Sequence, residues 1–273
     1  MATASLSAPS SAATVPSTVA LPGGDHPDRF DVLEAWYPVV YVADLDPQKP
    51  YRFTLLDQDL VIWWDRSAQQ WRSFRDECPH RLVPLSEGRI NEQGLLECPY
   101  HGWAFSGTGQ CEVIPQAAEA QTATAQSSPR ACVRSFPTTV AQDLLFIYPG
   151  TPERATTVSL PLINALEEDP QGWVCLNTFR DLPYDAFTLL ENVLDASHIP
   201  FTHHNTVGKR DNAAPVELEI NSANRFGFTG FWAEGPRRGT LGSQATRFLA
   251  PNFMEHDLTS KQDRKSTRLN SSH

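Results

Sequence analysis

The sequence lacks an apolar run long enough to cross a bilayer. Its longest apolar runs, such as Val39–Ala43, Leu60–Trp64 and Leu144–Tyr148, are far shorter than the roughly 20 residues that a membrane-spanning helix needs. We therefore expect no transmembrane segment in this chain.

Basic residues and cysteines are also scarce. The 273 residues include 22 Lys and Arg against 32 Asp and Glu, which gives a formal charge of −10. Because non-specific binding to nucleic acid depends on neutralising phosphates with Lys and Arg, we expect no nucleic-acid partner. Five cysteines, an odd number in a long chain, argue against a disulfide scaffold and favour a reducing compartment. Apolar residues make up 40% of the chain, which is enough for a packed core.

The two ends contain little that a core could bury. Residues 1–24 hold no charged side chain, so we predict a disordered N-terminal tail over residues 1–28. A targeting segment is the alternative, although transit peptides are usually Arg-rich and the first Arg here is Arg29. We also predict a disordered or aberrant polar tail over residues 258–273. The preceding stretch, Arg247–Met254, has the pattern of a single strand that enters a core, which suggests an interrupted chain.

Short strands dominate the pattern of the first half. Arg52–Leu56 and Asp59–Trp64 flank Asp57-Gln58, a plausible two-residue turn, and a second hairpin is indicated between Leu60–Trp64 and Trp71–Phe74. No segment with helical periodicity precedes residue 160.

One helical pattern appears in the second half. Strands are again indicated after it, at Leu218–Ile220 and Phe226–Trp232. The helix is predicted from residues spaced to lie on one of its faces, namely Phe187, Leu190, Leu194 and His198.

Two short loops each offer one thiolate and one imidazole, Cys78-Pro-His80 and Cys98-Pro-Tyr-His101, in the pattern C-x-H-x17-C-x2-H. Gly102 permits a tight turn behind His101. A Cys2His2 zinc site has the same ligand set, but zinc sites usually pair Cys with Cys and His with His in separate knuckles. A mixed pair in each loop suits a [2Fe–2S] cluster in which both sulfurs bind one iron and both imidazoles bind the other. The other three cysteines are expected to be ordinary buried thiols: Cys111, Cys132 and Cys175.

A second group of candidate ligands lies further along the chain. Asp195 and His198 are three residues apart, so a continuous helix would place both side chains on one face. Pro200 then bends the chain, and His203 can turn back towards His198 and share a metal with it. The alternative is a helix that ends near His198, with its histidines at the surface.

The first pattern closely resembles the Rieske iron–sulfur family, and Asn192-x2-Asp195-x2-His198-x4-His203 resembles the non-heme iron motif of Rieske oxygenases. Residues 191–215 are similar to the branch that contains pheophorbide a oxygenase and chlorophyllide a oxygenase. The likeness runs from about Trp36 to Asn252.

The resemblance implies a mainly β fold with an α+β part. A small antiparallel β Rieske [2Fe–2S] domain is expected over residues 29–150. The first part of an α+β, helix-grip-like catalytic domain is expected over residues 151–257.

The resemblance also implies roles for the candidate residues. In this family two His and a distant carboxylate bind Fe(II) and leave positions open for O2 and substrate, which implies Fe(II) ligands at His198 and His203. Asp195 would bridge His198 to a Rieske histidine, here His101, of a neighbouring subunit, and Asn192 joins it as a catalytic candidate. The cluster ligands would be Cys78, His80, Cys98 and His101.

The family's third iron ligand lies far downstream of its two His. The nearest carboxylates here are Glu255 and Asp257, and neither lies in a segment with helical periodicity, so we expect neither to bind iron. The plant members also carry a C-terminal Cys-x-x-Cys motif and membrane-anchoring helices, which this sequence lacks. We interpret the chain as the front part of an oxygenase.

The implied function is O2 activation with electrons that a ferredoxin or reductase delivers, in a homotrimer acting on a chlorophyll-derived tetrapyrrole. The implied location is the cytoplasm of a cyanobacterium-like phototroph, with possible thylakoid association, or the chloroplast of a eukaryote. Three alternatives stay open: an oxygenase for another aromatic or amine substrate, a non-catalytic Rieske electron carrier, and a zinc-stapled binding module. A basic patch for the donor would come from Arg72, Arg75 and Arg81, for which a structural role is equally plausible.

Overall fold

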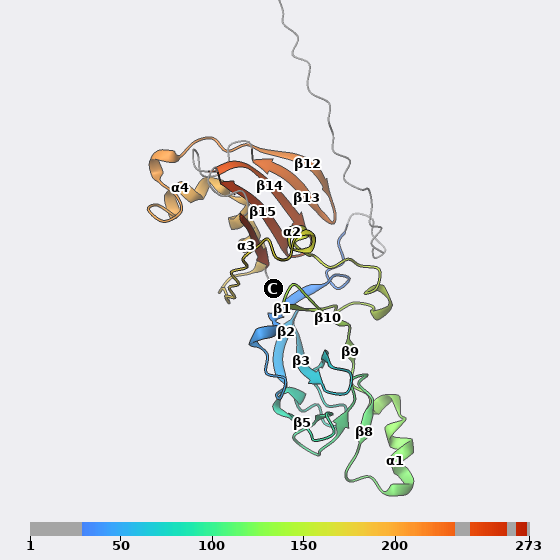
Figure 1. Ribbon diagram of the computed structural model, residues 1–273. Helices are drawn as coiled ribbons and strands as arrows, with labels where there is room; N and C mark the ends of the chain where they lie inside the picture. Colours follow the sequence, from blue (N-terminus) through green and yellow to red (C-terminus); the bar gives the residue numbers. More distant parts are fainter. Residues whose placement is uncertain (1–28, 233–240, 261–265, 272–273) are drawn as a thin grey trace, which may run out of the picture.

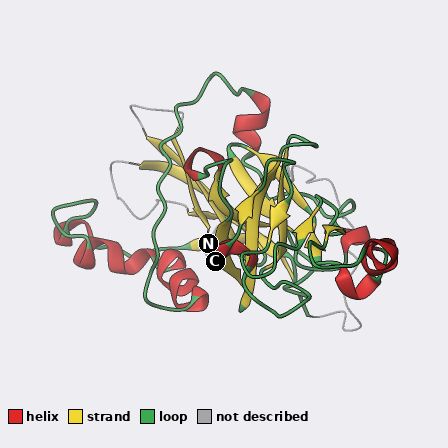
Figure 2. Cartoon of the chain, turned by 90° about the horizontal axis from the view of Figure 1, so that it is seen from below, coloured by secondary structure: helices red, strands yellow, loops and turns green. Residues whose placement is uncertain are grey.

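The computed structural model describes residues 29–232, 241–260 and 266–271. The N-terminal tail predicted at residues 1–28 lies outside these ranges. Figure 1 shows two β-rich bodies, one formed by the first half of the chain and one by the second. In Figure 2 the strands fill the middle of the molecule and the helices lie at its periphery. None of the helices described is long and apolar enough to span a membrane.

The first body consists of three small antiparallel sheets. The first sheet has the order β1 (Tyr37–Tyr41), β11 (Leu144–Ile147), β10 (Thr138–Ala141). The second has the order β2 (Tyr51–Leu55), β3 (Gln58–Asp65), β4 (Gln70–Arg75), β9 (Ser135–Phe136). The third has the order β5 (Arg89–Ile90), β6 (Leu96–Glu97), β7 (Ala104–Phe105), β8 (Cys111–Val113).

The apolar run Leu60–Trp64 lies in strand β3, and it is continuous because this strand is buried on both faces. Leu60 and Ile62 pack into a core shared with β1 and β11. Val61 and Trp63 pack on the other face into the core that contains Cys78 and Cys98. A single strand therefore connects the scaffold of this body to its candidate cluster loops.

The first predicted hairpin is present, but its turn lies one residue earlier than expected. Leu55 pairs with Gln58, so the turn residues are Leu56 and Asp57, with φ of 49° and 60°. Two left-handed residues form the tight turn that matches strand twist. This register places Phe53 opposite Leu60, and both belong to the same core.

One helix precedes residue 160 although the sequence shows no helical periodicity there. Helix α1 spans Glu119–Gln126. Its sequence, Glu-Ala-Gln-Thr-Ala-Thr-Ala-Gln, has no large apolar residue and therefore no periodicity to detect. Alanine is nevertheless the strongest helix former, which accounts for the helix.

The second body is a five-stranded antiparallel meander. Arg247–Met254, expected to be one strand, is a hairpin. Residues 258–260 continue the fourth strand of this sheet and residues 266–271 form the fifth, so the expected disordered tail is wrong for these residues. Strand ladders are held by backbone hydrogen bonds, which a polar sequence can supply as well as an apolar one. The strands are β12 (Leu218–Asn224), β13 (Gly227–Trp232), β14 (Leu241–Leu249), β15 (Phe253–Ser260) and β16 (Ser266–Ser271).

Three short helices accompany this sheet: α2 (Asn164–Glu168), α3 (Ala186–Leu194) and α4 (Ile199–Thr202). Asp185 caps the N-terminus of α3, where its carboxylate accepts hydrogen bonds from the backbone N–H groups of Phe187 and Thr188, both at 3.0 Å. The predicted helix is thus present, but it ends at Leu194 and does not continue to His198.

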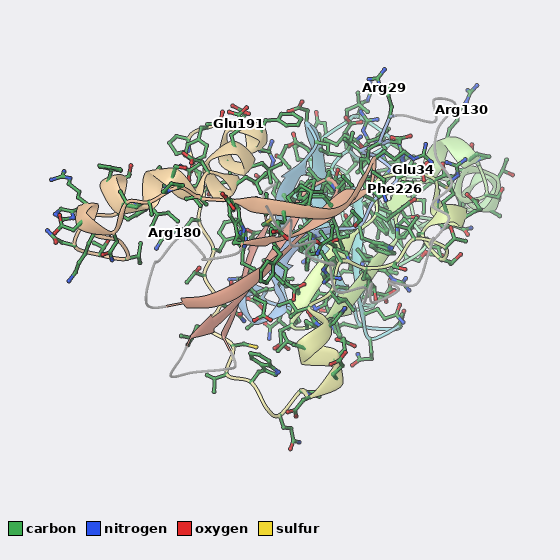
Figure 3. All side chains as sticks on the ribbon, turned by 90° about the horizontal axis from the view of Figure 1, so that it is seen from above. Arg29, Glu34, Arg130, Arg180, Glu191 and Phe226 are labelled. Atoms are coloured by element: carbon green, nitrogen blue, oxygen red, sulfur yellow. The ribbon has the colours of Figure 1, made fainter. Side chains whose placement is uncertain are left out.

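Contacts of Glu34 and Phe30 secure the start of the described chain. Phe30 meets Phe226 of the β12–β13 turn edge to face, with ring centroids 6.2 Å apart. The Glu34 carboxylate accepts hydrogen bonds from Tyr148 Oη at 2.5 Å and Thr151 Oγ1 at 2.8 Å. Figure 3 labels Glu34 and Phe226 in the same region of the molecule. The residues before β1 therefore contact both bodies.

Replacing Glu34 with glutamine is expected to make folding less sensitive to acid. Burial alone would raise the pKa of Glu34, but the hydrogen bonds from Tyr148 and Thr151 and the charge of Arg154 hold it below 4.5. A carboxyl with a depressed folded-state pKa stabilises the fold above its unfolded pKa, and that stability is lost as the pH falls through the folded value. E34Q should reduce the free energy of unfolding by about 1 kcal/mol at neutral pH, and by progressively less below pH 4.5.

Urea unfolding of the parent and E34Q across this pH range measures the effect. The matched control is Glu92→Gln, because Glu92 is an exposed loop residue. A constant difference between parent and E34Q at every pH would contradict the assignment.

Candidate metal centres

The two Cys/His loops are built on the same backbone pattern. Cys78 N–H donates to Val83 O at 2.9 Å, and Leu82 N–H donates back to Cys78 O at 2.8 Å. In the second loop Cys98 N–H donates to Trp103 O at 2.8 Å, and Gly102 N–H donates back to Cys98 O at 3.1 Å. Each cysteine therefore sits at the base of a closed six-residue loop, with its histidine on the loop itself.

The loops place the sulfurs inside and the imidazoles outside. Cys78 and Cys98 are each 2% exposed and their thiols contact one another. His80 is exposed and His101 is half-buried, and their ring centroids lie 4.7 Å apart. The structure thus brings the four predicted residues together as one sulfur pair and one imidazole pair.

In the absence of a metal, the surroundings of the sulfur pair favour the neutral thiol of Cys78. Burial, together with the neighbouring thiol of Cys98, raises the pKa of the Cys78 thiol to about 12, while the backbone N–H groups of His80 and Arg81 act in the opposite direction. The thiolate is the form that binds metals, so metal charge and these two N–H groups would stabilise it jointly.

Two aromatic side chains from the second loop hold the imidazoles. The Trp103 ring stacks on His80 at 4.7 Å with an interplanar angle of 8°. The Tyr100 ring lies against His101 at 3.9 Å and 35°. Sequence analysis gave neither aromatic a role. Their positions beside the candidate ligands in Cys98-Pro-Tyr-His-Gly-Trp could have identified Tyr100 and Trp103 from the sequence.

The paired arrangement distinguishes between the two candidate metals. In the portion of the chain that the structure describes, no three His, Cys, Asp or Glu converge on a point that a single ion could occupy. A tetrahedral zinc site needs four ligands around one ion, whereas a Rieske cluster needs a sulfur pair for one iron and an imidazole pair for the other. The donors present therefore fit the two-iron cluster.

Replacing Gly102 with alanine is expected to destabilise the fold and perturb the cluster loop. Gly102 has a φ of +72°, and a Cβ there would lie 3.1 Å from Pro115 Cγ. The left-handed conformation alone disfavours alanine by about 1–2 kcal/mol. Urea unfolding should detect this loss, and the electron paramagnetic resonance (EPR) spectrum of the reduced protein should broaden.

Gly94→Ala is the control for G102A. Gly94 has a similar φ of +79° and a similarly close neighbour in Arg66, but it lies outside the Cys/His loops. It should show a comparable stability loss with an unchanged EPR spectrum. Equal spectra for all three proteins would mean that Gly102 does not position the loop.

The second candidate centre follows α3. The rings of His198 and His203 lie 5.2 Å apart, with an interplanar angle of 56°, after a 3-10 turn at Ala196–His198 and the short helix α4. Pro200 is at the start of α4. The chain therefore turns after Leu194 and brings the two histidine rings close together.

Asp195 is not on a continuous helix with His198. It marks the break, where its carboxylate accepts a hydrogen bond from Ser197 N–H at 2.8 Å. Its Oδ2 lies 3.7 Å from His198 Nδ1, and its side chain is 53% exposed. His198 Nδ1 also contacts the Asp195 carbonyl oxygen. Asn192 is exposed on α3.

Neither of the two downstream carboxylates joins these histidines. Glu255 accepts hydrogen bonds from Arg247 at 2.6 and 2.9 Å across β14 and β15. Asp257 lies two residues further along β15, so its side chain is on the same face of the sheet as Glu255.

The remaining predicted residues have mixed outcomes. Arg72 pairs with the buried Asp65 at 3.3 Å and Arg75 pairs with Glu77 at 2.9 Å, so both have structural partners, whereas Arg81 is exposed. Among the three spare cysteines only Cys111 is buried; Cys132 and Cys175 are exposed. The expectation of buried thiols is wrong for those two, because both lie outside the packed strands.

Comparison with known proteins agrees with the paired geometry of the first centre. Residues 35–137 match the family model of the Rieske [2Fe-2S] domain. The chain carries a Rieske domain. The domain implies a [2Fe–2S] cluster, and the mostly antiparallel β fold with few helices is the fold class that the sequence predicted.

Plant relatives extend the match beyond the Rieske domain. The chain is 47% identical to rice pheophorbide a oxygenase over 213 residues, which cover 77% of this chain and 40% of the rice protein. It is 44% identical to the Arabidopsis thaliana protein of the same name over 237 residues, covering 85% of this chain and 43% of that protein. The chain is therefore homologous to the pheophorbide a oxygenases and spans less than half of their length.

The solved structure of dicamba monooxygenase bound to dicamba has the same fold. It superposes with a TM-score of 0.68 at 23% sequence identity, covering 86% of this chain and 69% of that one. The shared fold includes the second body, because the match extends well beyond residues 35–137.

Proposed function

We propose that this chain is the electron-receiving and iron-binding part of a Rieske-type oxygenase. The observation that carries the proposal is the presence of two separate groups of candidate metal ligands in one chain. One is the Cys78/Cys98 and His80/His101 set, and the other is the facing pair His198 and His203. An electron carrier needs only the first.

In the first centre, Cys78 and Cys98 would hold one iron of the cluster and His80 and His101 the other. The cluster, when bound, accepts and passes on single electrons, and a mononuclear Fe(II) activates O2. Burial of the sulfurs excludes water from one side, while exposed His80 gives the cluster an edge at the surface. Trp103 holds the plane of that exposed imidazole.

In the second centre, His198 and His203 would bind Fe(II). Asp195 supports a bridging role, because its carboxylate lies near His198 and is half-exposed, so it remains available to a histidine of another subunit. With His80 and His101 also reaching the surface, contact between subunits in a homotrimer is the arrangement that we propose. Asn192 is proposed to act beside Asp195.

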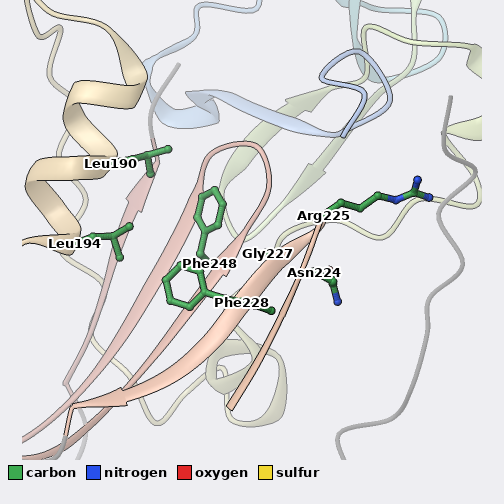
Figure 4. A pocket seen from close by; sticks show the side chains of 8 residues that line it. Leu190, Leu194, Asn224, Arg225, Gly227, Phe228 and Phe248 are labelled. Atoms are coloured by element: carbon green, nitrogen blue, oxygen red, sulfur yellow. The ribbon is translucent and has the colours of Figure 1, made fainter. Parts of the chain in front are cut away.

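The proposed substrate is a chlorophyll-derived tetrapyrrole. Support comes from the two plant homologues. An apolar pocket of about 260 Å³, which would hold part of such a molecule, lies between α3 and the sheet. Figure 4 shows Leu190 and Leu194 pointing from α3 towards the rings of Phe228 and Phe248. Leu194 directly precedes Asp195, so this pocket adjoins the second centre. An oxygenase for another aromatic or amine substrate is the alternative.

The proposed electron donor is a ferredoxin or reductase that docks near His80 and the exposed Arg81. The proposed location is the chloroplast in a eukaryote, as in the names of the plant relatives. In a cyanobacterium-like phototroph it is the cytoplasm, with or without association with thylakoids.

Iron and acid-labile sulfide analysis of the purified chain, together with EPR of the reduced protein, tests the proposal. We expect iron and sulfide in the ratio of a [2Fe–2S] cluster and a Rieske-type spectrum. Because no carboxylate joins His198 and His203 within the described residues, the second centre should bind Fe(II) weakly. Stoichiometric zinc without sulfide would refute the proposal, and a cluster without any second metal site would leave only an electron carrier.

A further inference from the structure

Trp103 joins the two Cys/His loops. It belongs to the second loop, where its carbonyl oxygen accepts a hydrogen bond from Cys98 N–H at 2.8 Å. Its ring, however, stacks on His80 of the first loop, with centroids 4.7 Å apart and an interplanar angle of 8°. One residue therefore closes the second loop through its backbone and contacts the first loop through its side chain.

The packing of Trp103 holds the stack in place. The indole is half-buried and packs against the core that contains Cys78 and Cys98, while His80 itself is exposed. A ring anchored in the core thus covers one face of an exposed imidazole and keeps water from that face.

Tyr100, the other aromatic residue of the second loop, is placed differently. Its ring lies against His101, its neighbour in the chain, at 3.9 Å and 35°, and the residue is 62% exposed. This tilted contact lies within one loop, so it does not join the two loops to each other. Tyr100 therefore provides an internal comparison for Trp103.

The charge of a Rieske cluster decides what a stacked indole does to it. With two thiolates, two neutral imidazoles, two sulfides and two Fe(III) ions, the oxidised cluster is formally neutral, and the reduced cluster carries one negative charge. The face of an aromatic ring is the negative part of its quadrupole. An indole face against a ligand of the cluster therefore disfavours the added electron. Solvent exposure also sets the potential of such clusters, because water stabilises the charged, reduced form.

We propose that Trp103 is a positioning residue that lowers the reduction potential of the Rieske cluster through its stack on His80. The two effects act in the same direction, since the indole face opposes the negative charge and the excluded water no longer stabilises it. The inference rests on the cluster ligands of the proposed function and is independent of the substrate.

Redox titration of the purified chain, followed by EPR at one neutral pH, tests the proposal. Trp103→Leu, which keeps an apolar side chain but removes the aromatic face, should make reduction about two- to tenfold more favourable, the range that an aromatic pair supplies. A tenfold change corresponds to a rise of about 59 mV for one electron. Trp103→Phe should stay closer to the parent, because a phenyl ring can stack in the same place.

Tyr100→Leu and Trp64→Phe are the matched controls. Tyr100 contacts the other imidazole in a tilted geometry. Trp64 packs against the same core as Trp103, but its ring meets Trp71 edge to face at 5.2 Å. Both variants should shift the potential less than W103L does. An equal shift in either control would assign the effect to a general disturbance of the domain and overturn the proposal.

A second measurement leaves the packing intact and does not depend on the stability of W103L. The parent and W103F are each grown with 5-fluorotryptophan, because fluorine withdraws electron density from the indole face. The potential of the parent should rise on fluorination, whereas that of W103F should not change. A rise of equal size in both proteins, or no rise in the parent, would overturn the role of Trp103.

The outcomes separate the inference from the function beneath it. A Rieske EPR signal in the parent with an unchanged potential in W103L overturns the role of Trp103 and leaves the cluster ligands intact. A parent chain without a Rieske signal after reconstitution with iron and sulfide overturns the proposed cluster site, and the inference with it.

Discussion

Replacement of Cys98 with serine is expected to abolish the Rieske EPR signal and to remove iron and acid-labile sulfide from the chain. Cys98 forms half of a buried sulfur pair with Cys78, and each is 2% exposed. A serine hydroxyl deprotonates far less readily than a thiol and is a poor substitute for a thiolate ligand of an iron–sulfur cluster. Because metal binding contributes folding free energy, the midpoint of thermal unfolding should fall as well.

Cys132→Ser is the matched control for C98S. Cys132 is an exposed thiol of the same body, so its replacement should leave iron, sulfide, EPR signal and unfolding midpoint unchanged. Metal and sulfide analysis with EPR on the same samples provides the comparison. A C98S protein that retains the signal, or a C132S protein that loses it, would contradict the ligand assignment.

Replacement of His203 with alanine is expected to reduce metal affinity at the second centre at least about tenfold while the Rieske cluster stays intact. Loss of residues that only support metal ligands already weakens binding by about 10–100-fold, and the His203 ring faces His198 directly at 5.2 Å. The cluster ligands belong to other loops, so the EPR signal should not change. Co(II) titration followed by visible absorption measures the affinity.

The adjacent histidine offers a sharp control for H203A. His204 accepts a hydrogen bond from Arg210 N–H at 3.2 Å, whereas the ring next to His198 is that of His203. H204A should therefore bind Co(II) as the parent does. Equal losses in H203A and H204A would indicate a general disturbance of the loop after α4, and no loss in H203A would remove His203 from the proposed iron site.

The candidate residues could be found from the sequence because each group is local in the chain. The spacing C-x-H-x17-C-x2-H confines both cluster loops to one short stretch, and His198 and His203 are likewise close together in the chain. Spacing and turn chemistry depend on neighbouring residues, and the sequence displays these directly. The fold class, the hairpin before Trp64 and the helix near Leu190 follow from patterns of the same local kind.

What the sequence by itself determined is therefore the identity of the donor groups, the Rieske pattern and the mainly β fold. Only the tertiary structure decided how these parts meet: sulfurs inside and imidazoles outside, a helix that ends at Leu194, a strand in place of the expected tail, and the stack of Trp103 on His80. Each of these depends on segments that are distant in the chain. Strand pairing uses backbone hydrogen bonds that side chains barely signal, and burial depends on which segment packs on top.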